Sequence, residues 1–232
     1  PREEPGTPTA AEETFRGAMA AVEALDPARL ERLLRREVVA LGAEPFLDRV
    51  VVPLLERIGT QWREGRLRPA HEHVAVAVVR QILGWMLERA RGAASGDTLV
   101  VGTLAGERHE LGALLAAATA ALRGWRVVFT GEDLPPEELA LTARSVGARA
   151  VGVSVTAPSD PEGVPGQLRA LLADLPADVT LYLGGGAAPE LGERVRDRRI
   201  RVMVTLGEFR AALARTDPPS PGEVADPALV AG

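Results

Sequence analysis

Residues 98–112 read TLVVGTLAGERHELG, and this stretch decides the fold of the second half of the chain. The apolar run Thr98–Leu104 is typical of a buried strand, the polar loop that follows is short, and a helix is expected at about Glu110–Arg123. The same alternation of short apolar runs and helical segments then repeats. Further strands are expected at Arg126–Thr130, Ala150–Val155, Thr180–Leu183 and Arg201–Thr205. Further helices are expected at Pro136–Val146, Pro161–Leu175, Ala188–Arg194 and Glu208–Ala214. Five such units predict an α/β domain with a doubly wound, five-stranded parallel sheet of Rossmann-like type.

The first half of the chain has helical periodicity instead. Apolar residues recur at helical spacing from Glu13 to Ala90, with breaks at Asp26-Pro27, Gly42, Gly65 and Pro69. Four helices joined by short turns predict an N-terminal four-helix bundle. The expected organisation is a flexible tail at 1–12, the bundle at 13–91, a linker at 92–97, the α/β domain at 98–215 and a second flexible tail at 216–232.

The composition excludes several chemistries. The 232 residues include 27 basic and 32 acidic ones, for a net charge of −5, and none is Cys or Lys. Disulfides, thiolate metal sites and lysine Schiff bases are therefore excluded, and three His allow only a sparse metal site. The acidic balance argues against a broad nucleic-acid surface. We expect a cytoplasmic protein, because no stretch has the pattern of a signal peptide or a membrane span.

Polar residues follow the first strand, at the edge where parallel sheets bind ligands. His109 offers an imidazole that can bind a metal, and Glu107, two residues earlier, can accept its other N–H. Gly112 removes a side chain where a bulky group would approach the helix. The alternative interpretation makes His109 an exposed loop residue, Glu107 a residue near the helix start and Gly112 a packing residue. These three residues alone favour neither interpretation.

Two other loops are expected at the same edge of the sheet. Ser154 and Thr156 follow the third strand, and Gly184, Gly185 and Gly186 follow the fourth. Hydroxyls provide donors and acceptors, and consecutive glycines let the backbone lie against a flat or extended ligand. Strand-end capping and a flexible turn are the alternatives. The glycines lack the spacing of a dinucleotide fingerprint, and no Lys follows them.

Taken together, these loops resemble the cobalamin-binding domains of methionine synthase and the corrinoid proteins, in which Asp-x-His-x-x-Gly, a Ser loop and a Gly-Gly loop occur in this order. The resemblance implies that His109 is the lower ligand to cobalt, with Glu107 in the place of the usual Asp. It implies that the nucleotide tail of the cofactor passes the Ser and Gly loops. The residues of this domain expected to contact cobalamin are Glu107, Arg108, His109, Gly112, Ser154, Thr156, Gly184, Gly185 and Gly186, with Thr156 matching less closely because its loop is one residue shorter.

The helical half resembles a narrower group. Trp62, followed ten residues later by Glu72 and His73, is similar to the Trp-x9-Glu-His pattern of the CarH/LitR-type light-responsive regulators. Those proteins bind adenosylcobalamin between a four-helix bundle and a cobalamin domain, and the resemblance covers residues 13–215. It implies that Trp62, Glu72 and His73 surround the upper face of the cofactor. The alternatives are a core position for Trp62 and ordinary first-turn positions for the other two.

Two departures from this group matter. Residues 1–30 lack the basic, aromatic pattern of a MerR-class helix-turn-helix domain, so we expect no direct nucleic-acid binding and a DNA-binding domain or protein partner outside this chain. Many of these receptors have a His directly after the Trp, whereas this chain has Arg63. His71, His73 or water would then have to bind the upper face of cobalt after light removes the adenosyl group. Arg63 is either a surface residue or a partner for the propionates of a second, non-covalent tetrapyrrole such as biliverdin.

The resemblance implies a cobalamin-dependent light sensor that acts without catalysis, forms homo-oligomers and does not bind membranes. The alternative is a corrinoid protein that carries methyl groups for a methyltransferase system, and a third interpretation is a domain that has lost its cofactor. Trp62 over the upper face of the cofactor favours the sensor, because a bulky covering side chain suits a large adenosyl ligand better than it suits the exchange of methyl groups.

Overall fold

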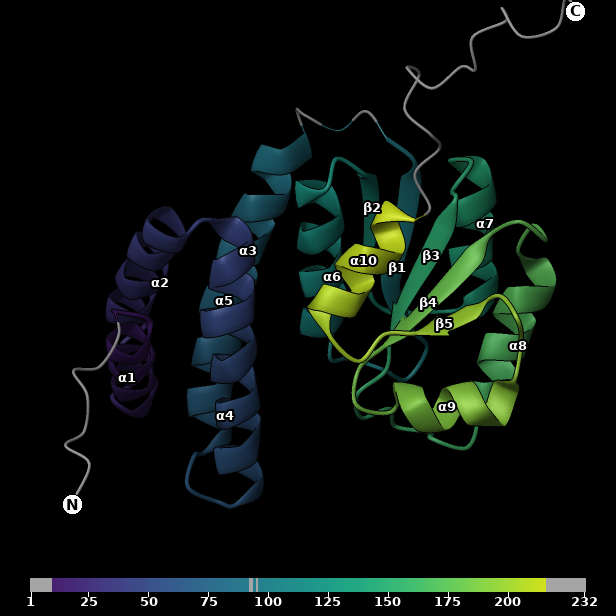
Figure 1. The fold of residues 1–232 in the computed structure, drawn as a ribbon. Helices are drawn as coiled ribbons and strands as arrows, with labels where there is room; N and C mark the ends of the chain where they lie inside the picture. Colours follow the sequence, from purple (N-terminus) through teal and green to yellow (C-terminus); the bar gives the residue numbers. More distant parts are fainter. Residues whose placement is uncertain (1–9, 92–93, 95, 216–232) are drawn as a thin grey trace, which may run out of the picture.

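The computed structural model describes residues 10–91, 94 and 96–215. Residues 1–9 and 216–232 of the expected tails, and residues 92, 93 and 95 of the expected linker, lie outside the described residues. Figure 1 shows two parts side by side, a helical part at the N-terminal end and an α/β part beyond it. Within the described residues, no helix combines the length and the apolar character that crossing a membrane requires.

The N-terminal part is the expected bundle. Its elements are α1 (Ala10–Glu23), α2 (Pro27–Leu41), a continuous helical segment made of α3 (Ala43–Phe46), η1 (Leu47–Val51) and α4 (Val52–Arg63), and α5 (Pro69–Arg91). The expected breaks separate these helices: Asp26 caps the start of α2 by accepting from the Arg29 N–H, and Gly42 and Gly65, which follow α2 and α4, have positive φ. The first helix begins at Ala10, three residues before the expected start at Glu13.

The third helical segment contains a π-helical turn, η1, that the sequence pattern did not predict. Pro53 lies two residues after the end of this turn, in the first turn of α4. Proline has no N–H to donate to the carbonyl four residues earlier, and its ring clashes with that carbonyl, so the helix widens locally. Turns of this kind are frequent at functional sites.

The second part is a sheet of five parallel strands in the order β2-β1-β3-β4-β5. The strands are β1 (Thr98–Leu104), β2 (Arg126–Leu134), β3 (Ala150–Ser154), β4 (Thr180–Gly184) and β5 (Ile200–Val202). The helices are α6 (Leu111–Leu122), α7 (Pro136–Ser145), α8 (Val164–Asp174), α9 (Ala188–Val195) and α10 (Leu206–Ala214). The predicted doubly wound parallel fold is confirmed, and the strand carboxyl ends all lie at one edge.

Helices cover both faces of the sheet (Figure 1). Helices α7, α8 and α9 form one apolar layer with the sheet, and α6 and α10 lie on the face toward the bundle. Helix α5 packs against α6, so a single apolar cluster runs from the bundle into the α/β part. The Glu44 carboxylate of α3 also pairs with Arg123 at the end of α6, at 2.7 Å. The two parts are therefore held together by packing and by ion pairs.

Strand β2 is longer than the sequence pattern predicts. It was expected to end at Thr130, but it continues to Leu134 through an irregularity in its pairing with β1. Gly131, with φ +82°, allows this irregularity, and the facing Gly102 has no room for a side chain, because a Cβ there would lie 2.1 Å from Thr130 Oγ1. The extension brings Glu132 and Asp133 to the carboxyl edge of the sheet.

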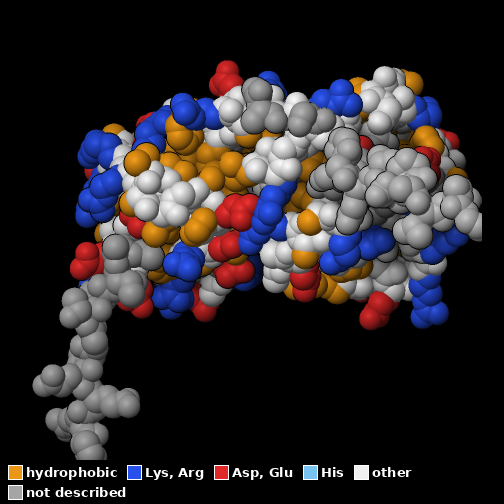
Figure 2. Space-filling view, turned by 45° about the horizontal axis from the view of Figure 1, so that its top comes forward, with side chains coloured by type: hydrophobic (Ala, Val, Ile, Leu, Met, Phe, Trp, Pro, Cys, Tyr) orange, Lys and Arg blue, Asp and Glu red, His pale blue; other side chains and the backbone are white. Residues whose placement is uncertain are grey.

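Charges on the surface are mixed. Figure 2 shows one face, on which basic side chains, all of them Arg in this chain, are interspersed with acidic ones. Over the described part of that face, no continuous basic area is visible.

Candidate functional site

The loop between β1 and α6 holds His109 in one orientation. The ring atom Nδ1 lies 2.6 Å from Oε1 of Glu107, and the backbone N–H of His109 donates to the same oxygen at 2.9 Å. The His109 side chain is 52% exposed, whereas that of Glu107 is 1% exposed. A proton on Nδ1 that is shared with the carboxylate leaves the lone pair of Nε2 available to a metal.

Glu107 is held from two loops at once. Its Oε2 accepts the backbone N–H groups of Thr156, at 2.6 Å, and Ala157, at 2.8 Å, in the loop after β3. Burial by itself raises the pKa of Glu107, but the hydrogen bonds from His109, Thr156 and Ala157 outweigh burial and hold this pKa below its ordinary value. A buried carboxylate therefore stays charged beside the imidazole and fixes the orientation of the ring.

Two residues that the sequence analysis missed fix the shape of this loop. The buried Thr103 hydroxyl donates to the Glu107 carbonyl at 2.5 Å and accepts the Asp133 N–H at 3.0 Å. The Asp133 carboxylate accepts the Gly106 N–H at 2.7 Å, and Asp133 has a left-handed backbone with φ 60°. A polar residue after the second strand was the available signal, but the strand was expected to end three residues earlier.

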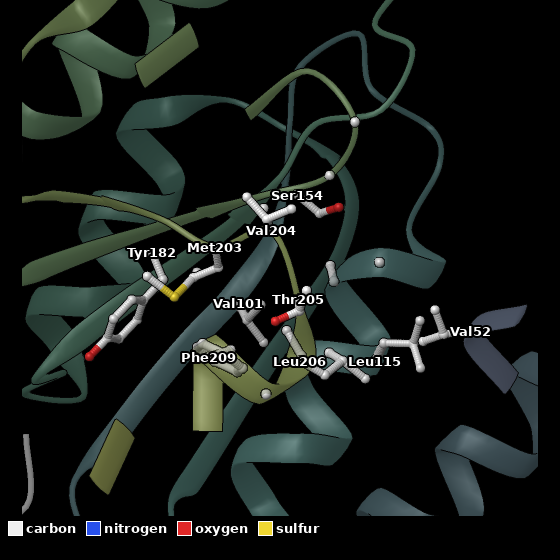
Figure 3. Close-up of a pocket in the computed structure, with 18 of the residues that line it drawn as sticks. Val52, Val101, Leu115, Ser154, Tyr182, Met203, Val204, Thr205, Leu206 and Phe209 are labelled. Atoms are coloured by element: carbon white, nitrogen blue, oxygen red, sulfur yellow. The ribbon is translucent and has the colours of Figure 1, made fainter. Parts of the chain in front are cut away.

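A cavity of about 780 Å³ lies beneath the Ser and Gly loops, between the sheet, α6 and α10. Ser154, Gly112 and the three glycines after β4 line its edge, as Figure 3 shows for Ser154. Apolar and aromatic side chains make up much of the rest: Val101, Leu115, Tyr182, Met203, Leu206 and Phe209. Cavities of this size and character hold nucleotide-sized ligands. The sequence pattern could not reveal these apolar residues, because they occupy ordinary core positions of strands and helices.

Three features of the cavity edge fit an extended ligand. The Ser154 hydroxyl is buried and has no hydrogen-bond partner among the described residues, so it is free to bind one. A Cβ at Gly112 would lie 2.4 Å from that hydroxyl oxygen, so a side chain at this position would displace the hydroxyl. Gly185 has φ +94°, and a Cβ there would lie 2.2 Å from the Val155 carbonyl oxygen, so only glycine fits.

The predicted residues of the bundle lie at the end of α4 and the start of α5. Trp62 is 46% exposed, His73 is exposed and Glu72 is partly exposed. Among the described residues, no hydrogen bond or ion pair joins Glu72 or His73 to the loop that carries His109. Trp62 is not a core residue, which removes the alternative interpretation of that position.

The remaining two candidates have local partners. Arg63 is exposed, and its guanidinium donates to the Thr60 hydroxyl at 3.3 Å. His71 accepts the Arg68 N–H on Nδ1 at 3.1 Å, which caps the start of α5. Arg108, next to His109, is exposed.

Helix α5 is tied to the same loop two turns beyond His73. The Arg80 guanidinium of α5 pairs with Oε1 of Glu110, the residue that follows His109, at 2.8 Å. The Glu110 side chain is 11% exposed. A movement of α5 against the sheet would therefore act directly on the residue beside His109.

The described residues contain no cluster of three or more His, Asp or Glu side chains that could hold a metal ion by themselves. His109, with its second nitrogen fixed by Glu107, suits a metal whose other positions are filled by a macrocycle. The orphan Ser154 hydroxyl and the glycine-lined cavity suit the nucleotide tail of such a cofactor. The residues present thus fit a corrinoid.

Comparisons with known proteins agree with this geometry. Family models described as "B12 binding domain" match residues 98–216 and residues 15–86. The chain is 32% identical over 177 residues to the HTH-type transcriptional repressor CarH of Myxococcus xanthus. The matched stretch covers 76% of this chain and 59% of CarH. The chain is 27% identical over 106 residues to corrinoid protein DSY3155 of Desulfitobacterium hafniense strain Y51, covering 43% of this chain and 49% of that protein. The chain thus spans about half to three fifths of these relatives.

The fold has a counterpart among solved structures. The monomethylamine corrinoid protein of Methanosarcina barkeri superposes with a TM-score of 0.72 and 16% identity, covering 89% of this chain and all of that protein. One of the family models matches slightly more than half of the chain, and it spans the whole sheet from β1 to α10. The chain belongs to the family of proteins with B12-binding domains, and its cofactor is a cobalamin.

Proposed function

We propose that this chain is the sensor part of a cobalamin-dependent photoreceptor, with adenosylcobalamin bound between the bundle and the sheet. The observation that carries the proposal is the exposed Trp62 at the end of α4, with Glu72 and His73 at the start of α5. Exposure of a large aromatic side chain to water is unfavourable in free energy, and a ligand that covers Trp62 would remove that unfavourable exposure. The similarity to the repressor CarH supports the same function.

Each residue then has a role that follows from its contacts. His109 would hold the cobalt of the cofactor through Nε2, while Glu107 keeps the Nδ1 proton in place. Ser154 and the glycines after β4 line the path of the nucleotide tail. Trp62, Glu72 and His73 pack around the upper ligand from the bundle. Bound adenosylcobalamin supplies a cobalt–carbon bond that light breaks.

Loss of the upper ligand would remove contacts to Trp62 and change how the bundle sits on the sheet. Helix α5 would carry this change to the loop of His109 through Arg80 and Glu110. The signal is then a population shift between two arrangements, driven by different contacts in each, and it needs no catalysis. A change in homo-oligomer size, read by a linked DNA-binding domain or a separate partner, would pass it on.

A carrier of methyl groups for a methyltransferase is the second candidate. It is favoured by the similarity to a corrinoid protein and by the fold shared with the monomethylamine corrinoid protein. A methyl carrier must expose its upper face to partner enzymes, whereas a Trp lid would cover that face.

The test is reconstitution in the dark with adenosylcobalamin, followed by absorption spectroscopy and size-exclusion chromatography before and after green light. Cyanocobalamin, which lacks the light-labile alkyl group, serves as the matched control. We expect a spectral change and a change in oligomer size with adenosylcobalamin only, and the size change should be lost in Trp62→Ala. Binding with no light-dependent change in size would reject the sensor in favour of the methyl carrier.

A further inference from the structure

The cavity assigned above to the nucleotide tail extends from the sheet to the bundle. Three residues of the bundle, Asp48, Val52 and Glu56, line it together with α10. Figure 3 shows Val52, from the bundle, on the side of Leu115 and Leu206. A ligand that fills this cavity therefore touches both parts of the molecule.

An ion pair joins the two parts at the cavity wall. The Arg210 guanidinium of α10 donates to both carboxylate oxygens of Asp48, at 3.2 Å and 2.5 Å. Arg210 is 12% exposed, and Glu44 lies further away, at 3.9 Å from its Nε. Asp48 belongs to the π-helical turn before Pro53. Two parallel charge-assisted bonds to a mostly buried guanidinium form the stronger kind of ion pair.

The charged groups at this wall leave an anion one way to bind, which is to take the Arg210 guanidinium from Asp48. The charged residues that line the cavity are Asp48, Glu56 and Arg210, so Arg210 is its one positive charge among the lining residues. The nucleotide tail of cobalamin contains a phosphodiester, which carries one negative charge. Arginine binds phosphate oxygens through the same two-pronged geometry that it uses here for Asp48.

We propose that Arg210 is a contact for the phosphodiester of the nucleotide tail, and that Asp48 of the bundle competes with the tail for it. Occupation of the cavity then loosens the hold of the bundle on α10. The competition makes binding of the tail and docking of the bundle oppose each other, so the bundle responds to the lower part of the cofactor as well as to the upper ligand. This inference rests on corrinoid binding and not on the light response.

The test compares two corrinoids in the dark. Cobalamin has the nucleotide tail and cobinamide lacks it, so the ratio of their dissociation constants isolates the contribution of the tail. Arg210→Gln should weaken cobalamin binding about 10-fold relative to cobinamide, because it removes a charged hydrogen bond. Asp48→Asn should strengthen cobalamin binding about 3-fold or more relative to cobinamide, because it frees Arg210. Arg210→Lys keeps a positive charge, so it should retain part of the preference for cobalamin over cobinamide.

The matched control is Arg80→Gln, which breaks another ion pair between the bundle and the α/β part, and neither Arg80 nor its partner Glu110 lines the cavity. It should leave the ratio unchanged. The inference is overturned if Arg210→Gln and Asp48→Asn shift the ratio in the same direction, if they change the binding of both corrinoids equally, or if Arg80→Gln has the same effect. A wild-type protein that binds both corrinoids but ignores light would reject the proposed sensor alone.

Discussion

Replacing Glu107 by Gln should damage both the fold and the cobalt ligand. The carboxylate accepts four hydrogen bonds: two from His109, one from Thr156 and one from Ala157. A Gln side chain has one carbonyl oxygen, so its NH₂ group must face either the two backbone donors or the His109 donors. Hydrogen bonds to a charged acceptor contribute about 1.5–3 kcal/mol each, and a buried donor left unpaired costs about 1–3 kcal/mol.

The expected loss in free energy of unfolding is about 2–4 kcal/mol for the cofactor-free protein, since at least two donors lose their acceptor. Cobalt ligation should weaken about 10- to 100-fold, because an NH₂ group facing Nδ1 moves the ring proton to Nε2. Urea unfolding measures the first quantity, and titration with cobalamin followed by absorbance measures the second. Both apply to the same purified variant.

Glu110→Gln is the matched control, three residues along the same loop. Its partner Arg80 is 53% exposed, so its loss should cost less than about 1 kcal/mol. If Glu107→Gln unfolds and binds cobalamin like the wild type, or if Glu110→Gln is equally harmful, the reasoning about Glu107 is refuted.

Three further substitutions test other parts of the structure. Gly185→Ala should lower the free energy of unfolding by about 2–4 kcal/mol, because φ is +94° and the new Cβ would lie 2.2 Å from the Val155 carbonyl oxygen. Its control is Gly186→Ala, which has open space around it and should lower the free energy of unfolding by less than about 0.5 kcal/mol in the same urea titration. His71→Ala should lower the stability by about 1 kcal/mol through loss of the cap on the Arg68 N–H, with unchanged cobalamin affinity; a large loss of affinity would instead assign His71 to the cofactor. Asp197→Asn should cost below about 1 kcal/mol at neutral pH, because hydrogen bonds from Arg199 lower the pKa of Asp197 beneath its ordinary value of 3.8. A carboxylate with a lowered pKa stabilises the fold above its ordinary pKa. The difference in free energy of unfolding between Asp197→Asn and the wild type should therefore shrink as the pH falls below 3.8. A difference that grows in acid would contradict this role of Asp197.

The positions of the loop residues could be predicted from the sequence because parallel strands end at one edge. His109, Ser154 and Gly185 follow three different strands, and the structure brings all three loops to that edge. The pairing of Glu107 with His109 was also predicted, since the two residues lie close together in one loop.

The contacts between distant segments could not be predicted in this way. Asp48 and Arg210 are 162 residues apart, and neither position has a pattern that distinguishes it from an ordinary surface charge. Tyr182 and Phe209 line the cavity from positions whose apolar spacing is that of any core. The position of Asp133 depends on an irregularity in the pairing of β2 at Gly131, and such an irregularity has no reliable sequence signal.

The most direct test of the account is electron paramagnetic resonance of the bound cob(II)alamin form, prepared with ¹⁵N-labelled protein and unlabelled cofactor. The unpaired electron on cobalt couples to the nitrogen of the lower ligand. A ¹⁵N ligand from His109 splits each line into a doublet, whereas a ¹⁴N ligand from the nucleotide base splits it into a triplet. The account predicts a doublet that disappears in His109→Ala. A triplet in the labelled wild-type protein would show that the base stays on cobalt, and it would contradict both the role of His109 and the presence of the tail in the cavity.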